Sequence, residues 1–196
     1  MDVEKICSVL KEGGLVITPT DTIYGIMGDA TNVSAINKLF DVKKRAYSKP
    51  LILLMDSYEM IEDYTSDISD IEKEYINKFF PGLVTIILKK NEKINDLITA
   101  GMDTVGIRIP DNKDLREIIK RLGRPIFSTS ANVSNEAVIT NINMISDDLK
   151  KQIDYIYDGG EVNDVASTII KFDNNNLKIL RDGKMSKQLL DRFSNK

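Results

Sequence analysis

Residues 168–180 read TIIKFDNNNLKIL, two apolar runs separated by the polar stretch DNNN at positions 173–176. Asn and Asp readily adopt the backbone conformations of tight turns, so this pattern predicts a β-hairpin. Two strands joined by so short a turn run antiparallel. We therefore expect a sheet that is not purely parallel.

Upstream of this hairpin, helical and strand-like patterns alternate along the chain. Helices are expected over residues 2–12, 33–40, 69–79 and 115–122, with a further short one over 186–193. Strands are expected over residues 15–18, 23–25, 51–55, 83–88, 105–110, 125–128 and 153–157. The chain has 196 residues, a length typical of one domain. The sequence thus predicts a single α/β domain over residues 1–196, built on one mixed sheet.

The chain contains no histidine, which removes the commonest general base near neutral pH and the commonest metal ligand. Hydrolases with a Ser-His-Asp triad and histidine-based zinc sites are therefore excluded. The remaining chemistry relies on lysine and arginine charges and on hydroxyl and backbone hydrogen bonds. We predict no metal site made by the protein alone, because a divalent ion would be held largely by substrate phosphates.

Charge and cysteine content restrict the class of protein further. The 27 basic and 30 acidic residues give a net charge of −3, which argues against a general nucleic-acid-binding surface. Cys7 is the only cysteine, so no intramolecular disulfide forms, and its apolar neighbours predict packing under a helix. No apolar run approaches the roughly 18 residues of a membrane span, and charges interrupt the N-terminus where a signal peptide needs an apolar stretch. We expect a cytoplasmic protein without membrane association.

Hydroxyl and cationic side chains gather at predicted strand ends and in adjoining loops, where α/β proteins commonly bind ligands. They lie in residues 19–22, 43–49, 128–132, 165–169 and 180–183. Each segment also has a local explanation, because Thr and Asp favour turns and cations favour helix C-termini. Neither a Walker loop nor a Gly-x-Gly-x-x-Gly motif is present, so spacing alone does not indicate a nucleotide site.

Two of these residues, Asp21 and Lys49, and also Arg108 carry sharper expectations. Arg108 lies in the alternating run 105–110, which predicts a half-buried strand with Arg108 either on its wet face or clamping a carboxylate or phosphate. Pro50 and the strand after it would hold Lys49 in place rather than leave it in solvent. Asp21 either influences Mg²⁺ through water or serves only its own turn.

Eight segments in order along the chain resemble the YrdC-like family of threonylcarbamoyl-AMP synthases, in its short single-domain form. They are GGLVITPTDTIYGI (13–26), KKRAYSKPLILL (43–54), PGLVTIILKK (81–90), TAGMDTVGIRIP (99–110), GRPIFSTSANVS (123–134), DGG (158–160), STII (167–170) and ILRDG (179–183). Each segment alone is unspecific, and the signal comes from finding all of them in register over nearly the whole chain.

The resemblance implies a twisted mixed open sheet with flanking helices around a basic cavity. It implies a nucleotidyltransferase that condenses L-threonine, bicarbonate and ATP to L-threonylcarbamoyladenylate and releases pyrophosphate. The product would supply threonylcarbamoyladenosine formation at position 37 of certain tRNAs. A downstream tRNA threonylcarbamoyl transferase complex would make the transfer, with weak or no direct tRNA binding by this chain.

The resemblance also implies roles for residues that match the family by position. The residues implied to contact L-threonine are Thr22, Arg108, Ser128 and Ser167. Those implied to contact ATP are Arg45, Lys49, Thr104, Ser130, Asn132 and Arg181, with Lys43 nearby. Arg45, Lys49 and Arg108 are the implied catalytic residues, since positioned cations stabilise charge that develops during phosphoryl transfer. ATP is a substrate here, and Mg²⁺ would be held mainly by its phosphates.

Three positions depart from the family pattern. Leu54 stands where some relatives have a histidine near threonine, Ala46 where proline is frequent, and Val138 where some relatives place a hydroxyl for ATP. Two alternatives stay open. One is a paralogue of the same fold, although such paralogues tend to lose the Ser-Ala-Asn segment that is intact here at 130–132. The other is an RNA-binding module that uses the basic cavity.

Overall fold

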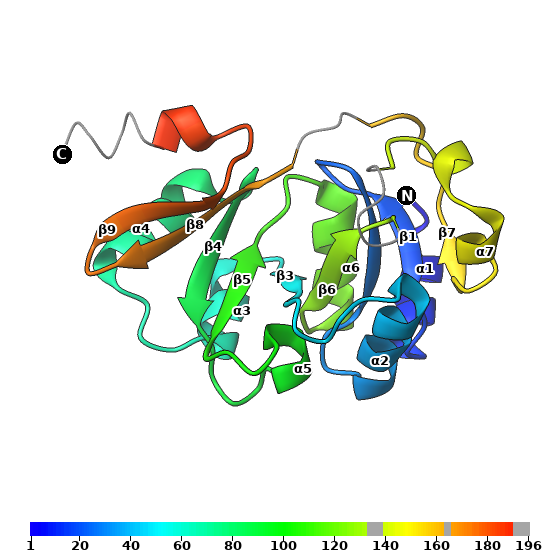
Figure 1. Ribbon diagram of the computed structural model, residues 1–196, viewed down its shortest axis with the longest axis horizontal. Coiled ribbons are helices and arrows are strands. Elements are labelled where there is room, and N and C mark those ends of the chain that lie inside the picture. Colours follow the sequence, from blue (N-terminus) through cyan, green and yellow to red (C-terminus); the bar gives the residue numbers. More distant parts are fainter. Residues whose placement is uncertain (133–138, 163–165, 190–196) are drawn as a thin grey trace.

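The computed structural model describes residues 1–132, 139–162 and 166–189 (Figure 1). Within them, nine strands form one sheet in the order β7-β1-β2-β6-β3-β5-β4-β8-β9. The pairs β1–β7, β3–β5 and β4–β8 run parallel, whereas the other neighbouring pairs run antiparallel. The predicted mixed α/β architecture is confirmed, and the sheet is twisted with helices flanking it (Figure 1).

The strands are β1 (Val16–Pro19), β2 (Tyr24–Asp29), β3 (Ile52–Leu54), β4 (Val84–Lys89), β5 (Thr104–Arg108), β6 (Ile126–Ser130), β7 (Tyr155–Ile156), β8 (Thr168–Asp173) and β9 (Asn176–Arg181). The helices are α1 (Val3–Lys11), α2 (Val33–Lys43), α3 (Tyr58–Tyr64), α4 (Asp70–Phe79), α5 (Asp96–Thr99), α6 (Lys113–Leu122) and α7 (Asp147–Lys150), with a 3-10 helix η1 (Ile142–Met144). Of the helix expected over 186–193, residues 186–189 are helical and the remainder lies outside the described residues.

The hairpin that decided the sheet type forms as predicted. Asp173 pairs with Asn176, and the two residues between them, Asn174 and Asn175, have φ angles of 47° and 64°. Positive φ at both central positions is the conformation of a type I′ turn, whose twist matches that of the flanking strands. The asparagines therefore specify the antiparallel β8–β9 pair.

Side-chain caps explain where several helices begin. Ser69 and Glu72 form the predicted capping box at the start of α4, and Gly123 ends α6 with a φ of 71°. The short helices α3, α5 and α7 were not expected, because none is long enough for a clear apolar period. Each begins at a side-chain cap, and the three capping residues are Ser57, Asn95 and Ser146.

The sheet has a helix-covered face and a partly open face. Ile26, Leu53 and Phe127 belong to the core on the side of α2, α3 and α4, whereas their strand neighbours Met27 and Leu54 pack with α1 and α6. Successive side chains of a strand point to opposite faces, which accounts for the two cores. Helices α1 and α6 cover only part of their face, so the rest is available to form a pocket.

One expectation about β5 is wrong. The alternating run 105–110 predicts a half-buried strand, yet every residue from Val105 to Arg108 is buried. Ile107 packs into the core on the side of α2, α3 and α4. Arg108, on the opposite face, is buried and pairs with Asp21, a residue distant in sequence. No helix among the described residues is long and apolar enough to cross a membrane.

Candidate functional site

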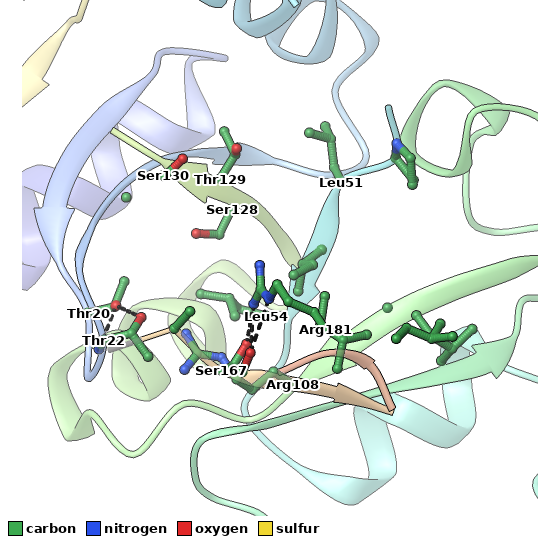
Figure 2. Close-up of a pocket in the computed structure, with 18 of the residues that line it drawn as sticks. Thr20, Thr22, Leu51, Leu54, Arg108, Ser128, Thr129, Ser130, Ser167 and Arg181 are labelled. Atoms are coloured by element: carbon green, nitrogen blue, oxygen red, sulfur yellow. Dashed lines mark hydrogen bonds between the residues drawn. The ribbon is translucent and has the colours of Figure 1, made fainter. Parts of the chain in front are cut away.

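A pocket of about 560 Å³ lies on the partly open face of the sheet (Figure 2). Its wall includes Gly25, Leu54, Gly106 and Ser128, which come from β2, β3, β5 and β6. These residues occupy alternate positions on neighbouring strands and therefore share one face. Glycine at two of the positions leaves open space above the strands. The pocket thus rests on the central part of the sheet.

The turn between β1 and β2 brings two hydroxyls to the pocket. Thr20 Oγ1 donates to the Ile23 carbonyl at 2.8 Å and lies 2.6 Å from Thr22 Oγ1. It also accepts from the Thr22 amide at 3.0 Å. Thr20 therefore holds the turn together, and it places the hydroxyl of Thr22 in the pocket wall (Figure 2).

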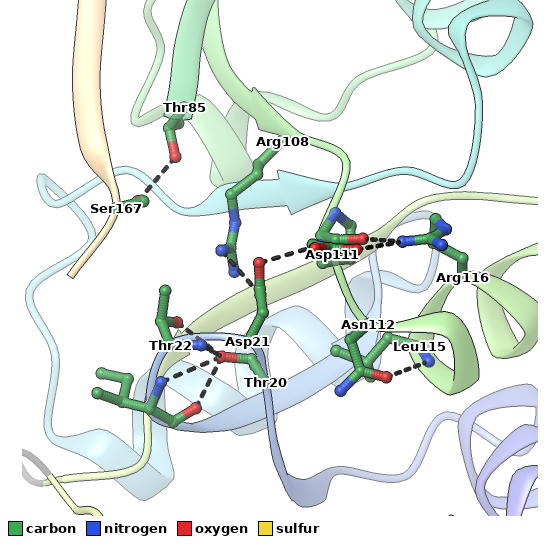
Figure 3. A network of polar contacts seen from close by, with 12 residues as sticks. Thr20, Asp21, Thr22, Thr85, Arg108, Asp111, Asn112, Leu115, Arg116 and Ser167 are labelled. Atoms are coloured by element: carbon green, nitrogen blue, oxygen red, sulfur yellow. Dashed lines mark hydrogen bonds and ion pairs between the residues drawn. The ribbon is translucent and has the colours of Figure 1, made fainter. Parts of the chain in front are cut away.

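Arg108 of β5 forms a buried ion pair with Asp21, which lies in the turn between β1 and β2. Arg108 Nη1 donates to Asp21 Oδ1 at 2.9 Å, and the two side chains are only 6% and 8% exposed (Figure 3). Burial lowers the pKa of the Arg108 guanidinium, and the Asp21 carboxylate opposes this shift. A planar guanidinium held at one nitrogen keeps other N–H donors for a bidentate anion.

Ser167 and Arg181 line the same part of the pocket from the β8–β9 region. Ser167 Oγ accepts from Arg181 Nη2 at 2.8 Å and lies 2.9 Å from Thr85 Oγ1 of β4 (Figures 2 and 3). Burial lowers the pKa of Arg181, and the charge of Arg108 adds to this effect. Two guanidiniums close enough to repel each other favour an anion between them.

A second cluster of cations lies at the end of α2. Lys43 is buried, and its Nζ donates to Thr129 Oγ1 at 3.2 Å and also to the Ser130 carbonyl. Burial lowers the pKa of Lys43 to about 7, and the charges of Arg45 and Lys49 act in the same direction. Arg45 lines the pocket, where its Nη2 donates to the Pro50 carbonyl at 2.9 Å. This end therefore combines backbone-anchored cations with hydroxyls.

The structure brings most of the sequence-predicted site residues into the pocket wall. They are Thr22, Arg45, Thr104, Arg108, Ser128, Ser130, Ser167 and Arg181. Asn132 lies just behind the wall, where it is buried and its Oδ1 accepts from Ser130 Oγ. Leu54 lines the pocket as an apolar side chain, and Ala46 is exposed. Val138 lies outside the described residues.

Lys49 departs from expectation. Its side chain is exposed, and it is not among the residues that line the pocket. Its backbone carbonyl accepts from Arg45 Nε at 3.3 Å. The prediction that Pro50 and β3 keep Lys49 out of solvent is wrong, because the Arg45 side chain is the one that turns back over this segment.

Some site residues were not foreseen from the sequence. Thr85 sits in an apolar strand with no local sign of its contact to Ser167, and Lys171 lines the pocket from β8. Asp21 was assigned to its own turn or to Mg²⁺, yet its carboxylate contacts Arg108. All three depend on strand pairing or on contacts between segments far apart in sequence, which a single strand pattern does not reveal.

The donor set of the pocket does not fit a protein-held metal ion. Among the described residues there is no group of three or more His, Cys, Asp or Glu side chains able to hold one. Asp21, the carboxylate bound to Arg108, accepts from Arg108 with one oxygen and from the Asp111 amide with the other. Cations and hydroxyls instead suit an anionic ligand.

Comparisons with known proteins agree with this geometry. The model of the Sua5/YciO/YrdC family, described as telomere recombination, matches residues 8–183. The chain is 37% identical over 194 residues to a putative threonylcarbamoyl-AMP synthase of Methanocaldococcus jannaschii, covering 96% of this chain and 91% of that protein. It is 35% identical over 162 residues to the threonylcarbamoyl-AMP synthase of Pyrococcus abyssi, covering 82% and 48%. The chain thus spans about half the length of the Pyrococcus protein.

Solved structures show the same relationship. The crystal structure of Pyrococcus abyssi Sua5 complexed with L-threonine has a TM-score of 0.91 at 31% identity, covering 97% of this chain and 56% of that chain. Escherichia coli YciO shares the fold, with a TM-score of 0.83 at 22% identity over 93% of this chain and 89% of that chain. Since the family model matches most of its length, this chain belongs to the Sua5/YciO/YrdC family.

Proposed function

We propose that this protein is an L-threonylcarbamoyladenylate synthase, a nucleotidyltransferase that uses L-threonine, bicarbonate and ATP. One observation carries the proposal. A single pocket is lined by one set of residues, Arg108, Thr22 and Ser167, and by a second set, Arg45 with the Ser130 hydroxyl. The first set suits an amino-acid carboxylate, and the second suits phosphate oxygens. The name of the Methanocaldococcus relative and the threonine complex of the Pyrococcus protein support the same activity.

At the threonine end, Arg108 would bind the carboxylate with the guanidinium nitrogens that Asp21 does not use. Thr22, Ser128 and Ser167 would supply hydroxyls to the rest of the amino acid. Leu54 presents an apolar wall at this end, where some relatives place a histidine. Orientation by the guanidinium would leave the threonine amine facing the rest of the pocket, since a bidentate contact fixes direction as well as distance.

At the nucleotide end, Arg45, Thr104 and Ser130 would contact ATP, with Lys43 and Asn132 behind them. Arg181 would also contact ATP, from the border with the threonine end, where it bonds Ser167. Lys43 would fix the strand end by its bond to the Ser130 carbonyl. Mg²⁺ would arrive with the ATP phosphates, because the pocket residues do not fit a metal ion of their own. Exposed Lys49 would serve from the rim rather than from inside the pocket.

The reaction would proceed in two steps. The threonine amine forms a C–N bond to the carbon of bicarbonate, water is lost, and a carbamate results. A carbamate oxygen then attacks the α-phosphorus of ATP, and pyrophosphate leaves. Positioned arginines stabilise the charge on the phosphoryl oxygens, a contribution of a few kcal/mol per group (roughly 3) in comparable sites. Charge neutralisation and positioning can support this chemistry without histidine.

The adenylate would be consumed by a tRNA threonylcarbamoyl transferase complex in the cytoplasm, with weak or no tRNA binding by this chain. Among the described residues, the cations that line the pocket are accompanied by hydroxyl and apolar side chains. Together with the net charge of −3, this composition does not favour an RNA-binding module. The Sua5/YciO/YrdC fold also occurs in YciO, so activity needs a direct test.

The test is pyrophosphate release from ATP, with mass spectrometry of the product. We expect release only when L-threonine and bicarbonate are both present, and a product with the mass of L-threonylcarbamoyladenylate. Release that ignores threonine would contradict the proposal, and so would no release at all. A gel-shift titration with tRNA addresses the RNA-binding alternative, which requires tight binding with a steep salt dependence. Lys93→Ala is a suitable control, because Lys93 is exposed and pairs with Asp63 away from the pocket wall.

A further inference from the structure

Asp21 links the β1–β2 turn to β5 and to the segment that follows β5. Its Oδ1 accepts from Arg108 Nη1, and its Oδ2 accepts from the backbone N–H of Asp111, both at 2.9 Å (Figure 3). Asp21 belongs to the β1–β2 turn, whereas Asp111 follows β5. Both carboxylate oxygens thus have partners from a segment about ninety residues away in sequence.

The partner loop is itself fixed to α6. Arg116 Nη1 donates to the Pro110 carbonyl at 2.6 Å and pairs with Asp111 Oδ1 at 3.6 Å (Figure 3). Asn112 caps the helix by accepting from the Leu115 amide at 3.1 Å. The Asp111 N–H therefore has a defined direction, and the carboxylate that it binds is held in one orientation.

The β1–β2 turn does not need the Asp21 side chain for its own shape. Thr20 Oγ1 accepts from the amides of Thr22 and Ile23 and donates to the Ile23 carbonyl. These are the local bonds usually made by a turn residue. The carboxylate of Asp21 instead binds Arg108 of β5, so its role concerns the guanidinium.

Charge at this end depends on Asp21. Arg108 and Arg181 both line the pocket, the charge of Arg108 helps to lower the pKa of Arg181, and among the described residues no carboxylate lines the pocket. Asp21, which does not line the pocket, pairs with Arg108 and neutralises its positive charge. The remaining single charge matches an amino-acid carboxylate, whereas two uncompensated guanidiniums match a phosphate dianion.

We propose that Asp21 is a positioning residue that orients Arg108 and makes the threonine end select a monoanionic carboxylate over phosphate. This inference rests on the proposed function, because it takes L-threonine as the ligand of Arg108. It gives a reason why the phosphates of ATP do not occupy the neighbouring anion site in the same pocket. Without that exclusion, ATP or inorganic phosphate would compete with threonine.

The test variant is Asp21→Asn. The amide keeps the size of the carboxylate but removes its charge, and its nitrogen faces a donor, either Arg108 or the Asp111 N–H. We expect the dissociation constant for L-threonine, measured by isothermal titration calorimetry, to rise about tenfold or more, the usual effect of losing a charged hydrogen bond. We expect inorganic phosphate to become a competitor of threonine in the variant and not in the wild type.

A control comes from another aspartate–arginine pair, in which the aspartate is buried and the Arg124 side chain is 37% exposed. Asp29 is 2% exposed and accepts from Arg124 Nε at 2.6 Å, outside the pocket wall. Asp29→Asn removes a buried carboxylate from an ion pair away from the pocket, so it reports the effect of lost stability. We expect this variant to bind threonine as the wild type does and to ignore phosphate.

Asp21→Glu tests whether the charge of the carboxylate or its position is responsible for each effect. This variant keeps the negative charge but displaces the carboxylate, so threonine binding should weaken while phosphate still fails to compete. It also carries the test if Asp21→Asn does not fold. The proposal is overturned if Asp21→Asn behaves like Asp29→Asn, if Asp21→Asn weakens threonine binding without any gain in phosphate competition, or if Asp21→Glu binds threonine as the wild type does. Wild-type protein that binds threonine but releases no pyrophosphate would refute the proposed function and leave the anion-selectivity result to be judged by calorimetry alone.

Discussion

The Arg181 side chain of β9 donates three hydrogen bonds to Ser167. Its Nη2 lies 2.8 Å from Ser167 Oγ and 2.9 Å from the Ser167 carbonyl, and its Nε lies 3.2 Å from the same carbonyl. Ser167 belongs to the proposed threonine set, and Arg181 to the proposed nucleotide set. The two substrate ends of the pocket therefore meet at one side-chain contact.

Arg181→Lys should raise the KM for both substrates. A lysine provides a single point charge and does not reproduce the forked contact with Ser167, so we expect the KM for ATP to rise about tenfold or more. The KM for threonine should rise less, because Ser167 keeps its bond to Thr85. Steady-state pyrophosphate release with each substrate varied checks this. Lys178→Ala, on the same strand but exposed and paired with Asp173, is the control. Unchanged KM values in Arg181→Lys would show that the Arg181–Ser167 contact is not needed for binding either substrate.

Arg108→Lys should affect the KM for L-threonine and leave the KM for ATP almost unchanged. Lysine keeps the charge near Asp21 but loses bidentate geometry, so the KM for L-threonine is expected to rise by roughly tenfold or more while the KM for ATP stays within about twofold. The same kinetic assay measures both values. An equal rise in the two would show that Arg108 does not belong to a threonine-specific end.

Lys43 gives a prediction about pH. Its pKa is lowered from 10.5 to about 7 by burial, so between these values the unfolded chain holds a proton that the folded chain has lost. Stability rises with pH wherever the unfolded state binds more protons. The contribution of Lys43 to the free energy of unfolding should therefore increase from about pH 7 toward about pH 10.

Lys43→Met removes this titration and keeps the long side chain. Urea unfolding of wild type and variant at several pH values should give a stability difference that shifts toward the wild type as pH rises. Lys11→Met, at an exposed residue of α1, is the control and should show no such trend. A difference that stays flat with pH would mean that Lys43 keeps its ordinary pKa.

Arg45 and Lys49 should differ in their importance for ATP. Arg45 lines the pocket and is braced by two backbone carbonyls, whereas Lys49 is exposed. We expect Arg45→Ala to raise the KM for ATP by about tenfold or more, as for other lost charge-assisted contacts. Lys49→Ala should cause a smaller rise that shrinks at high salt, since exposed charges are screened. Measuring the KM for ATP of both variants at two ionic strengths tests this. A rise for Lys49→Ala that is larger than that for Arg45→Ala and independent of salt would mean that Lys49 contacts ATP inside the pocket.

Much of the fold follows from local sequence. The asparagines at 174 and 175 specify the hairpin turn, Ser69 and Glu72 start α4, and Gly123 ends α6. These features depend on neighbours a few residues apart, so a single sequence displays them. The short helices α3, α5 and α7 escaped prediction because a cap without a sustained apolar period is a weak signal.

The candidate site was predicted as a set of residues but not as an arrangement. Motif order identified Arg108, Ser128, Ser167 and Arg181, and all four line one pocket. Their partners were not predictable, because Asp21 reaches Arg108 across 87 positions and Thr85 reaches Ser167 across 82. Such contacts arise only when distant segments are brought together across the sheet.

By itself, the sequence determined a mixed α/β chain without histidine, with a hairpin near residue 175 and hydroxyls and cations at strand ends. Only the tertiary structure decided which cations are buried and which are solvated. Lys43 is enclosed while Lys49 is exposed, although six positions separate them along the chain. The physical reason is that desolvation and charge pairing depend on the segments packed around a side chain, and those segments come from all parts of the fold.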